Sequence, residues 1–73
     1  MDINMKLTGE HLRAARAALD LSKKVACAHI GITVNTLTSM EAGKRVAETT
    51  TRVAQQFYEG RGVSFKLRGI DWL

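Results

Sequence analysis

The stretch GITVNTLTSMEAGKR, from Gly31 to Arg45, decides the fold because a strand and a helix both fit part of it. In a strand, every second residue from Ile32 to Met40 would share the buried face. That strand would leave Leu37 in water and would not explain the two glycines that bracket the segment. A helix accounts for both features, so we predict a helix that begins after Thr33.

The predicted helix separates an apolar face from a polar face. Because successive residues lie 100° apart around the axis, Leu37 falls at the centre of the buried face, with Met40 and the stem of Glu41 beside it. Gly43 stands where helices commonly end in a left-handed conformation. The opposite, outward face carries Asn35 and Ser39, with Thr38 and Ala42 next to them.

A second short helix precedes this one in the sequence. Ser22 can cap a helix over KKVACAHI, and Gly31 ends it. Because only Gly31 and Ile32 separate the two helices from the next cap, the segment has the helix-turn-helix arrangement. The residues expected to turn inward are Val25, Ala26 and Ile30, with Cys27 close by.

Two further helices flank this pair. Thr8 can cap a first helix, with Glu10 near the positive end of the helix dipole. A fourth helix runs from about Glu48 to Tyr58, before Gly60 and Gly62. The inward residues expected are Leu12, Ala15 and Leu19, with Ala18 beside them, and Val53, Ala54 and Phe57 in the fourth helix.

The end of the chain changes character. From Val63 onward apolar and polar residues alternate, which indicates a short strand. We therefore predict a mainly α fold of four short helices with a central helix-turn-helix and a C-terminal strand-like tail used for dimerisation. We expect the 73 residues to form one domain, with an N-terminal arm (1–6), a helical core (7–59) and a tail (60–73). The candidate dimer-interface residues are Val63, Phe65, Leu67, Ile70 and Trp72; for Trp72, a place in the core is an equal alternative.

Charge and composition narrow the class of partner. The 11 Lys and Arg residues exceed the 7 Asp and Glu residues, and the formal net charge of +4 favours a polyanionic partner without requiring one. Cys27 has no second cysteine to pair with, and no apolar run reaches signal-peptide or membrane-span length, so we expect a cytoplasmic protein. Cys27 and His29 alone do not make a zinc site. We expect no metal, cofactor, membrane contact or small-molecule ligand.

The outward face of the helix after Thr33 suits the major groove of DNA. Asparagine pairs with adenine through two hydrogen bonds, serine and threonine hydroxyls bond to several base edges, and valine or threonine methyl groups contact thymine. Lys23, Lys44 and Arg45 lie where phosphates would pass. Arg13 and Arg16 on the first helix are either phosphate contacts or part of a solvated charged face.

Two segments carry a resemblance to a known family. LRAARAALDLS and GITVNTLTSMEAGKR resemble the first helix and the helix-turn-helix of the Cro/CI-type (XRE) regulators of phages and bacteria. The second segment matches the family pattern Gly-Val-Ser-x-x-Thr-Ile-x-x-x-Glu-x-Gly-Lys. The later GVSF is similar to a tail common in small bacterial members, often on mobile elements. The resemblance covers most of the chain.

This resemblance implies a role for each matching residue. Glu41 takes a structural position, and Thr33 caps the helix and contacts the DNA backbone. The base-reading positions fall on Val34, Asn35, Thr38 and Ser39. The phosphate-binding positions fall on Lys23, where the family normally has Gln, and on Thr33, Thr36, Gly43, Lys44 and Arg45.

The chain departs from the family in two places. Ala26 and Cys27 stand where the second helix usually carries Leu-Ala, so the packing there is expected to be looser or filled by Val25. The fifth helix, through which many relatives dimerise, has no counterpart, and we expect the C-terminal tail to replace it.

Three classes of function compete. We predict a sequence-specific regulator of transcription, a repressor rather than an activator, that binds an inverted-repeat operator in double-stranded DNA as a homodimer, with RNA polymerase as a further candidate partner. The alternative is a protein-interaction module, an antitoxin or antiactivator, on the same scaffold. The sequence shows no paired carboxylates, nucleophile–base set or glycine-rich phosphate loop, so we predict no enzyme.

Overall fold

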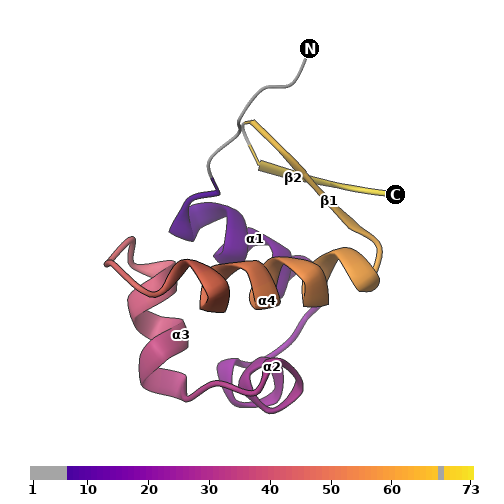
Figure 1. The fold of residues 1–73 in the computed structure, drawn as a ribbon. Helices are drawn as coiled ribbons and strands as arrows, with labels where there is room; N and C mark the ends of the chain where they lie inside the picture. Colours follow the sequence, from indigo (N-terminus) through magenta and orange to yellow (C-terminus); the bar gives the residue numbers. More distant parts are fainter. Residues whose placement is uncertain (1–6, 68) are drawn as a thin grey trace.

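The computed structural model describes residues 7–67 and 69–73, so the predicted N-terminal arm (1–6) lies outside the described residues. The mainly helical fold with a central helix-turn-helix is confirmed (Figure 1). The elements are α1 (Gly9–Ala18), α2 (Lys23–Ile30), α3 (Val34–Glu41), α4 (Glu48–Gly60), β1 (Val63–Lys66) and β2 (Gly69–Trp72).

The first three helices begin at the predicted caps, and a predicted glycine follows α2 and α3. The side chains of Thr8, Ser22 and Thr33 each accept a hydrogen bond from a backbone N–H three residues further on. Gly31 and Gly43 adopt left-handed conformations with φ of 89° and 80°, which an L side chain would oppose. These local signals set α3 as a helix and the turn before it as a tight one.

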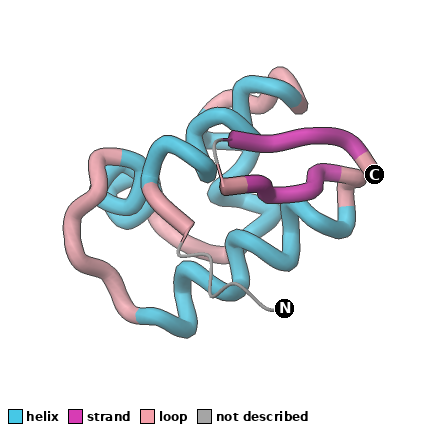
Figure 2. Tube along the Cα trace, turned by 90° about the horizontal axis from the view of Figure 1, so that it is seen from above, coloured by secondary structure: helices cyan, strands magenta, loops and turns pink. Residues whose placement is uncertain are grey.

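The hydrophobic core lies where the four helices and the hairpin meet. Helix α1 contacts α3, α4 and β2, while α2 contacts α3 and α4, and α4 contacts β1. Seen from above, the hairpin lies over one side of the helices (Figure 2). The largest fully buried side chains are Tyr58, Leu12, Leu37 and Val63.

Three residues expected to face inward do not. Val25 and Val53 are 44% and 45% exposed, and Ala18 is exposed, while Cys27 and Tyr58 are buried. Helix α2 contacts both α3 and α4, and this close approach selects the small residues Ala26 and Cys27 instead of Val25. The expectation that Val25 fills the packing space beside Ala26 and Cys27 is therefore wrong.

The tail folds as a hairpin and not as a single strand. Strands β1 and β2 pair antiparallel, with Val63 opposite Trp72 and Phe65 opposite Ile70. Directly paired residues share one face of a sheet, and this face turns toward the helices. Leu67 lies in the turn, beyond the end of β1. Val63 is completely buried within the protomer, so its assignment to a dimer interface is wrong.

His11 connects the hairpin to α1, a contact that the sequence analysis missed. Its Nδ1 accepts a hydrogen bond from the backbone N–H of Thr8, which completes a capping box. The opposite ring nitrogen, Nε2, therefore carries the hydrogen and donates it to the carbonyl of Lys66 in β1. One buried imidazole thus ties the start of α1 to the hairpin.

Candidate nucleic-acid interface

Helix α3 presents one buried face and one free face. Leu37, Met40 and Glu41 are buried, as the helical periodicity predicts. Of the residues predicted to read bases, Val34, Asn35 and Thr38 are exposed, whereas Ser39, which was expected to point outward, is half-buried. The four residues predicted to read bases therefore lie on one helix, and three of them are open to solvent.

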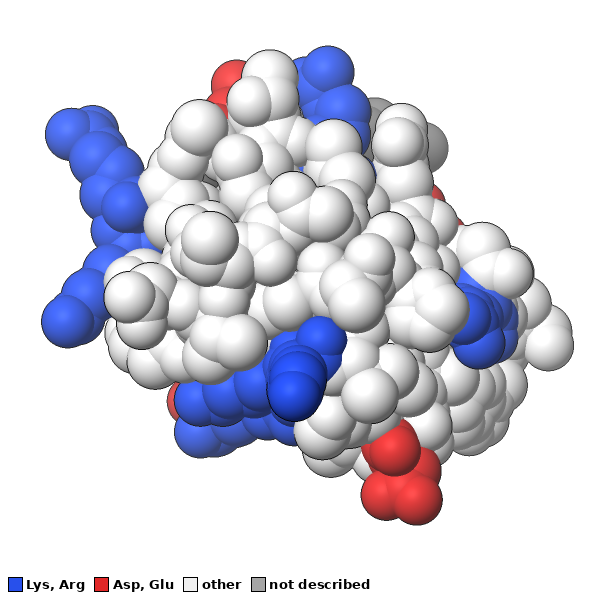
Figure 3. Space-filling model, turned by 90° about the horizontal axis from the view of Figure 1, so that it is seen from below, with Lys and Arg blue, Asp and Glu red and all other residues white. Residues whose placement is uncertain are grey.

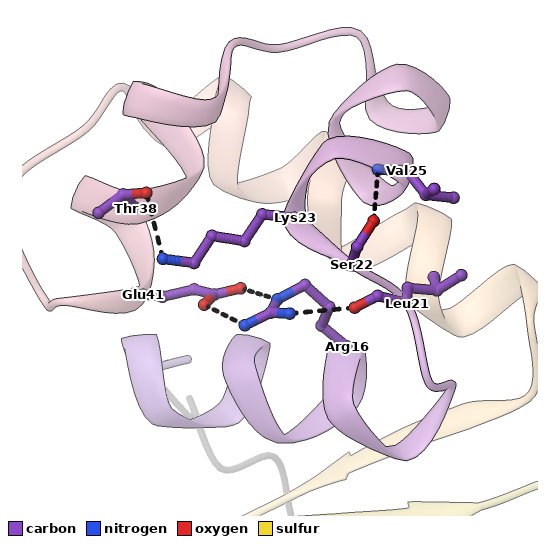
Figure 4. Close-up of polar contacts among 7 residues, drawn as sticks. All are labelled: Arg16, Leu21, Ser22, Lys23, Val25, Thr38 and Glu41. Atoms are coloured by element: carbon purple, nitrogen blue, oxygen red, sulfur yellow. Dashed lines mark hydrogen bonds and ion pairs between the residues drawn. The ribbon is translucent and has the colours of Figure 1, made fainter.

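A buried ion pair holds α3 against α1. Arg16 Nε donates to Glu41 Oε2 at 2.7 Å, and Arg16 Nη2 donates to Glu41 Oε1 at 3.0 Å (Figure 4). The side chains are only 16% and 5% exposed. These hydrogen bonds raise the pKa of the Arg16 guanidinium. Two parallel hydrogen bonds between planar groups restrict orientation as well as distance. The pair therefore constrains how α3 is oriented relative to α1.

Arg16 is therefore neither a phosphate contact nor part of a solvated charged face, the two alternatives that the sequence left open. Its guanidinium does not lie on a solvated face and is not free for phosphate, because Nη1 also donates to the carbonyl of Leu21 at 3.0 Å. The sequence signal for the pair was Glu41, a carboxylate at the edge of an otherwise apolar face. The structural position that the resemblance implies for Glu41 agrees with this ion pair.

Gly9 allows α1 to begin directly against the end of α3. A Cβ atom placed on Gly9 would lie 2.4 Å from the carbonyl oxygen of Glu41 and 2.5 Å from that of Met40. No side chain fits in that space. The contact was missed from the sequence because a glycine at the first position of a helix has no special local requirement.

The predicted phosphate-binding residues lie at both ends of α3. At the start, the Thr33 hydroxyl accepts from the backbone N–H of Thr36 and donates to the Thr36 hydroxyl at 3.0 Å. At the far end, Gly43, Lys44 and Arg45 are exposed in the loop that leads to α4.

Lys23 reaches α3 from the first position of α2. Its Nζ donates to Thr38 Oγ1 at 3.3 Å (Figure 4). The view from below, onto α2 and the start of α3, shows Lys and Arg side chains around an uncharged centre, with acidic atoms at the margins (Figure 3). A polyanion approaching this face meets cations on several sides.

Cys27 and His29 do not lie in a shared environment. Cys27 is buried in the core, and burial raises the pKa of its thiol. His29 is exposed, and its ring stacks on Phe57 with centroids 5.5 Å apart. In residues 7–67 and 69–73 no group of three or more His, Cys, Asp or Glu side chains could hold a metal ion. No helix in these ranges has the length and apolar character needed to cross a bilayer.

Comparison with known families agrees with this geometry. The helix-turn-helix domain family matches residues 8–64, which span α1 to α4 and the start of the hairpin. The chain belongs to this family of helix-turn-helix domains, in agreement with the resemblance to XRE-type regulators. No curated protein and no solved structure matches it. The family indicates a DNA-binding regulator.

Proposed function

We propose that the protein is a sequence-specific regulator of transcription that inserts α3 into the major groove of double-stranded DNA. The observation that carries this proposal is the exposure of Asn35 and Thr38 on a helix whose other face is locked by Leu37 and the Arg16–Glu41 pair. Asn35 offers both a donor and an acceptor, the combination that adenine presents in the major groove. Val34 and the partly covered Ser39 complete the proposed base-reading set.

The flanks of α3 supply contacts to the DNA backbone. Thr33 and Thr36 stand at its positive end, where backbone N–H groups favour anions. Lys44 and Arg45 follow Gly43 at the other end. We assign these residues to phosphate binding, because contacts on both sides of a recognition helix set its register on the duplex.

A homodimer is the form in which we expect the protein to bind. One helix with short polar side chains discriminates weakly, and a two-fold axis that places two α3 helices about 34 Å apart reads an inverted repeat. Leu67 and Trp72 are 71% and 53% exposed on the hairpin, whereas Phe65 and Ile70 are half-buried against the core. We therefore reduce the dimer candidates to Leu67 in the turn and Trp72 at the open end of the hairpin, where Leu73 follows it.

Edge-to-edge pairing of β2 is not the form of dimer that the hairpin favours. The Asp71 carboxylate accepts the backbone N–H of Trp72 at 2.8 Å, so that edge donor is already occupied. A charged side chain on an edge strand is a common obstacle to further strand pairing. Apolar contact through Trp72 and Leu67 is the better-supported arrangement.

The proposal has a regulatory consequence. We infer that such a dimer blocks RNA polymerase at a promoter and so acts as a repressor. We place it in the bacterial cytoplasm, encoded by a bacterial genome or by a mobile element, and without an enzymatic activity of its own. Regulation would follow from protein concentration and operator spacing.

Selection of bound sites from a random pool of duplex DNA tests this function. We expect an inverted repeat with a defined half-site spacing. Asn35→Ala should weaken binding to that site by about 1–3 kcal/mol and relax the preference at one base. Lys44→Ala should weaken binding to all duplexes alike and lower the slope of log affinity against log salt concentration by about 1. Arg52→Ala on α4, an exposed residue outside the proposed contacts, serves as a charge control. Recovery of no sequence, or an unchanged site for Asn35→Ala, would refute the assignment.

A protein-interaction module, such as an antitoxin or antiactivator, is the second candidate. The exposed hairpin residues Trp72 and Leu73, which follow one another at the open end of the hairpin, favour it, because exposed apolar surface commonly marks a protein contact. Salt distinguishes the two candidates. DNA binding weakens steeply as salt rises, whereas an apolar protein contact does not.

A further inference from the structure

Lys23 and its neighbour Lys24 behave differently although both begin α2. Lys24 is exposed, whereas Lys23 is half-buried and directs its ammonium group toward α3. There Nζ donates to Thr38 Oγ1 at 3.3 Å, across 15 residues of sequence (Figure 4). The charge thus lies against the outward face of α3, next to a predicted base-reading hydroxyl.

The chemistry of this contact determines how the Thr38 hydroxyl is oriented. An ammonium group has three N–H donors and no acceptor, so the Thr38 oxygen must accept. The single hydroxyl hydrogen of Thr38 then points away from Lys23. Apart from the contact with Lys23, the Thr38 hydroxyl takes part in no side-chain hydrogen bond among the described residues, so its hydrogen is free for an external acceptor.

The pair therefore offers hydrogens from two neighbouring atoms. Lys23 retains two N–H groups and Thr38 retains one O–H group. In the major groove, guanine presents two acceptors, N7 and O6, whereas adenine presents one acceptor and one donor, and cytosine presents a donor. Thymine presents a single acceptor, O4, beside a methyl group. Guanine is therefore the base that can accept from both donors of the pair.

We infer that the Lys23–Thr38 pair reads a guanine in each half-site, which makes Lys23 a specificity-determining residue and not only a phosphate contact. This inference rests on the proposed DNA-binding function. Asn35, three residues before Thr38 on the same helix, carries both a donor and an acceptor and reads a different base. The half-site is thus expected to hold a guanine near the base that Asn35 contacts.

The experiment uses the full chain and the duplex selected from a random pool. Each guanine of the half-site is replaced in turn by 7-deazaguanine, which keeps base pairing and removes the N7 acceptor. Affinities are measured for the unaltered protein, Lys23→Met and Thr38→Val at one salt concentration. Lys24→Met is the matched control, because it removes the same charge one residue away. Thermal unfolding by circular dichroism checks that each variant is folded.

We expect 7-deazaguanine at one position of the half-site to lower the affinity of the unaltered protein by about tenfold. Lys23→Met and Thr38→Val should bind the original duplex more weakly and lose sensitivity at that position. Lys24→Met should lower the affinity for every duplex equally and keep the tenfold difference between the guanine and 7-deazaguanine duplexes.

Two results would overturn the inference while leaving the proposed function intact. In one, Lys23→Met lowers affinity for all duplexes to the same extent, as Lys24→Met does, so that Lys23 binds only phosphate. In the other, Thr38→Val retains the full guanine preference. A selection that recovers no duplex at all overturns the proposed function, and the inference with it.

Discussion

At the scale of single residues, Glu41 does most to orient α3. Its carboxylate is bound by two guanidinium nitrogens of Arg16, and its side chain is 5% exposed. A buried charge is tolerated only when it is paired and hydrogen-bonded. Loss of one partner is therefore more damaging than loss of both.

Replacement of Glu41 by Ala should leave the partly buried Arg16 guanidinium with only the Leu21 carbonyl as a partner and lower the free energy of unfolding by about 1–3 kcal/mol. The double variant Arg16→Met/Glu41→Leu should recover most of that loss, because apolar residues of similar volume can replace a buried ion pair. Urea unfolding of the three proteins measures both changes. A loss below about 1 kcal/mol for Glu41→Ala would show that the pair is effectively solvated.

Tyr58 is the second residue with an unusual environment. The residue is completely buried, and among the described residues its hydroxyl has no hydrogen-bond partner. Burial, with a smaller contribution from the charge of Glu41, raises the pKa of Tyr58 to about 12. The folded state therefore holds this proton more tightly than the unfolded chain, whose tyrosine titrates near 10.

Two results follow for Tyr58→Phe. At pH 7 the variant should be as stable as the unaltered protein or up to about 1 kcal/mol more stable, because no internal hydrogen bond is lost. The unaltered protein should lose stability as the pH rises from about 10 toward 12, and the variant should lose less. Melting temperatures of both proteins across this range provide the test. A marked loss for Tyr58→Phe at pH 7 would indicate that a buried water satisfies the hydroxyl.

At the scale of elements, the contact between the start of α1 and the end of α3 is the tightest that the structure shows at a glycine. The backbone of Glu41 leaves no room for a Cβ atom on Gly9. Because the obstacle is backbone and not a flexible side chain, a larger residue must displace one helix. The same helix end bears the Arg16–Glu41 pair, so the two contacts act on α3 together.

Gly9→Ala should destabilise the protein by about 1–3 kcal/mol through overpacking and should weaken DNA binding as α3 shifts. Gly60→Ala is the control, because Gly60 is also helical and a Cβ there would meet nothing within 4 Å. That substitution should be neutral or stabilise by up to about 1 kcal/mol. Equal effects at the two positions in thermal unfolding would mean that α1 does not rest against α3 in solution.

At the scale of the whole molecule, the most exposed large apolar side chains in residues 7–67 and 69–73 lie on the hairpin and directly after it. Leu67, Trp72 and Leu73 are each more than half exposed. They lie at the two ends of the hairpin, the first in the turn and the others where the strands open. A chain of this size buries a modest share of its surface, so covering these residues in a dimer would add substantially to its stability.

Trp72→Ala should shift the protein from dimer to monomer in sedimentation velocity at micromolar concentration. Its affinity for the inverted repeat should fall far more than its affinity for a single half-site, because only the first requires two protomers. Val53→Ala, which removes an exposed apolar residue from α4, should change neither quantity. A monomeric unaltered protein would remove the hairpin from the proposed mechanism.

The sequence by itself determined where the first three helices begin and how the turn between α2 and α3 is made. Thr8, Ser22 and Thr33 act on backbone groups within three residues, and Gly31 and Gly43 meet a local requirement for positive φ. Signals of this range can be read along the chain. The amphipathic pattern of α3 was predictable for the same reason, since the spacing of Leu37, Met40 and Glu41 along the chain is enough to define its buried face.

Only the tertiary structure decided which of several apolar residues in α2 and α4 are buried. Val25 and Cys27 both fit a helical face, and the angle at which α2 meets α3 and α4 chose between them. The Arg16–Glu41 pair joins residues 25 apart in sequence, and the hairpin required a partner strand for β1. Contacts of this kind depend on how helices cross and strands pair in space, so no local pattern specifies them.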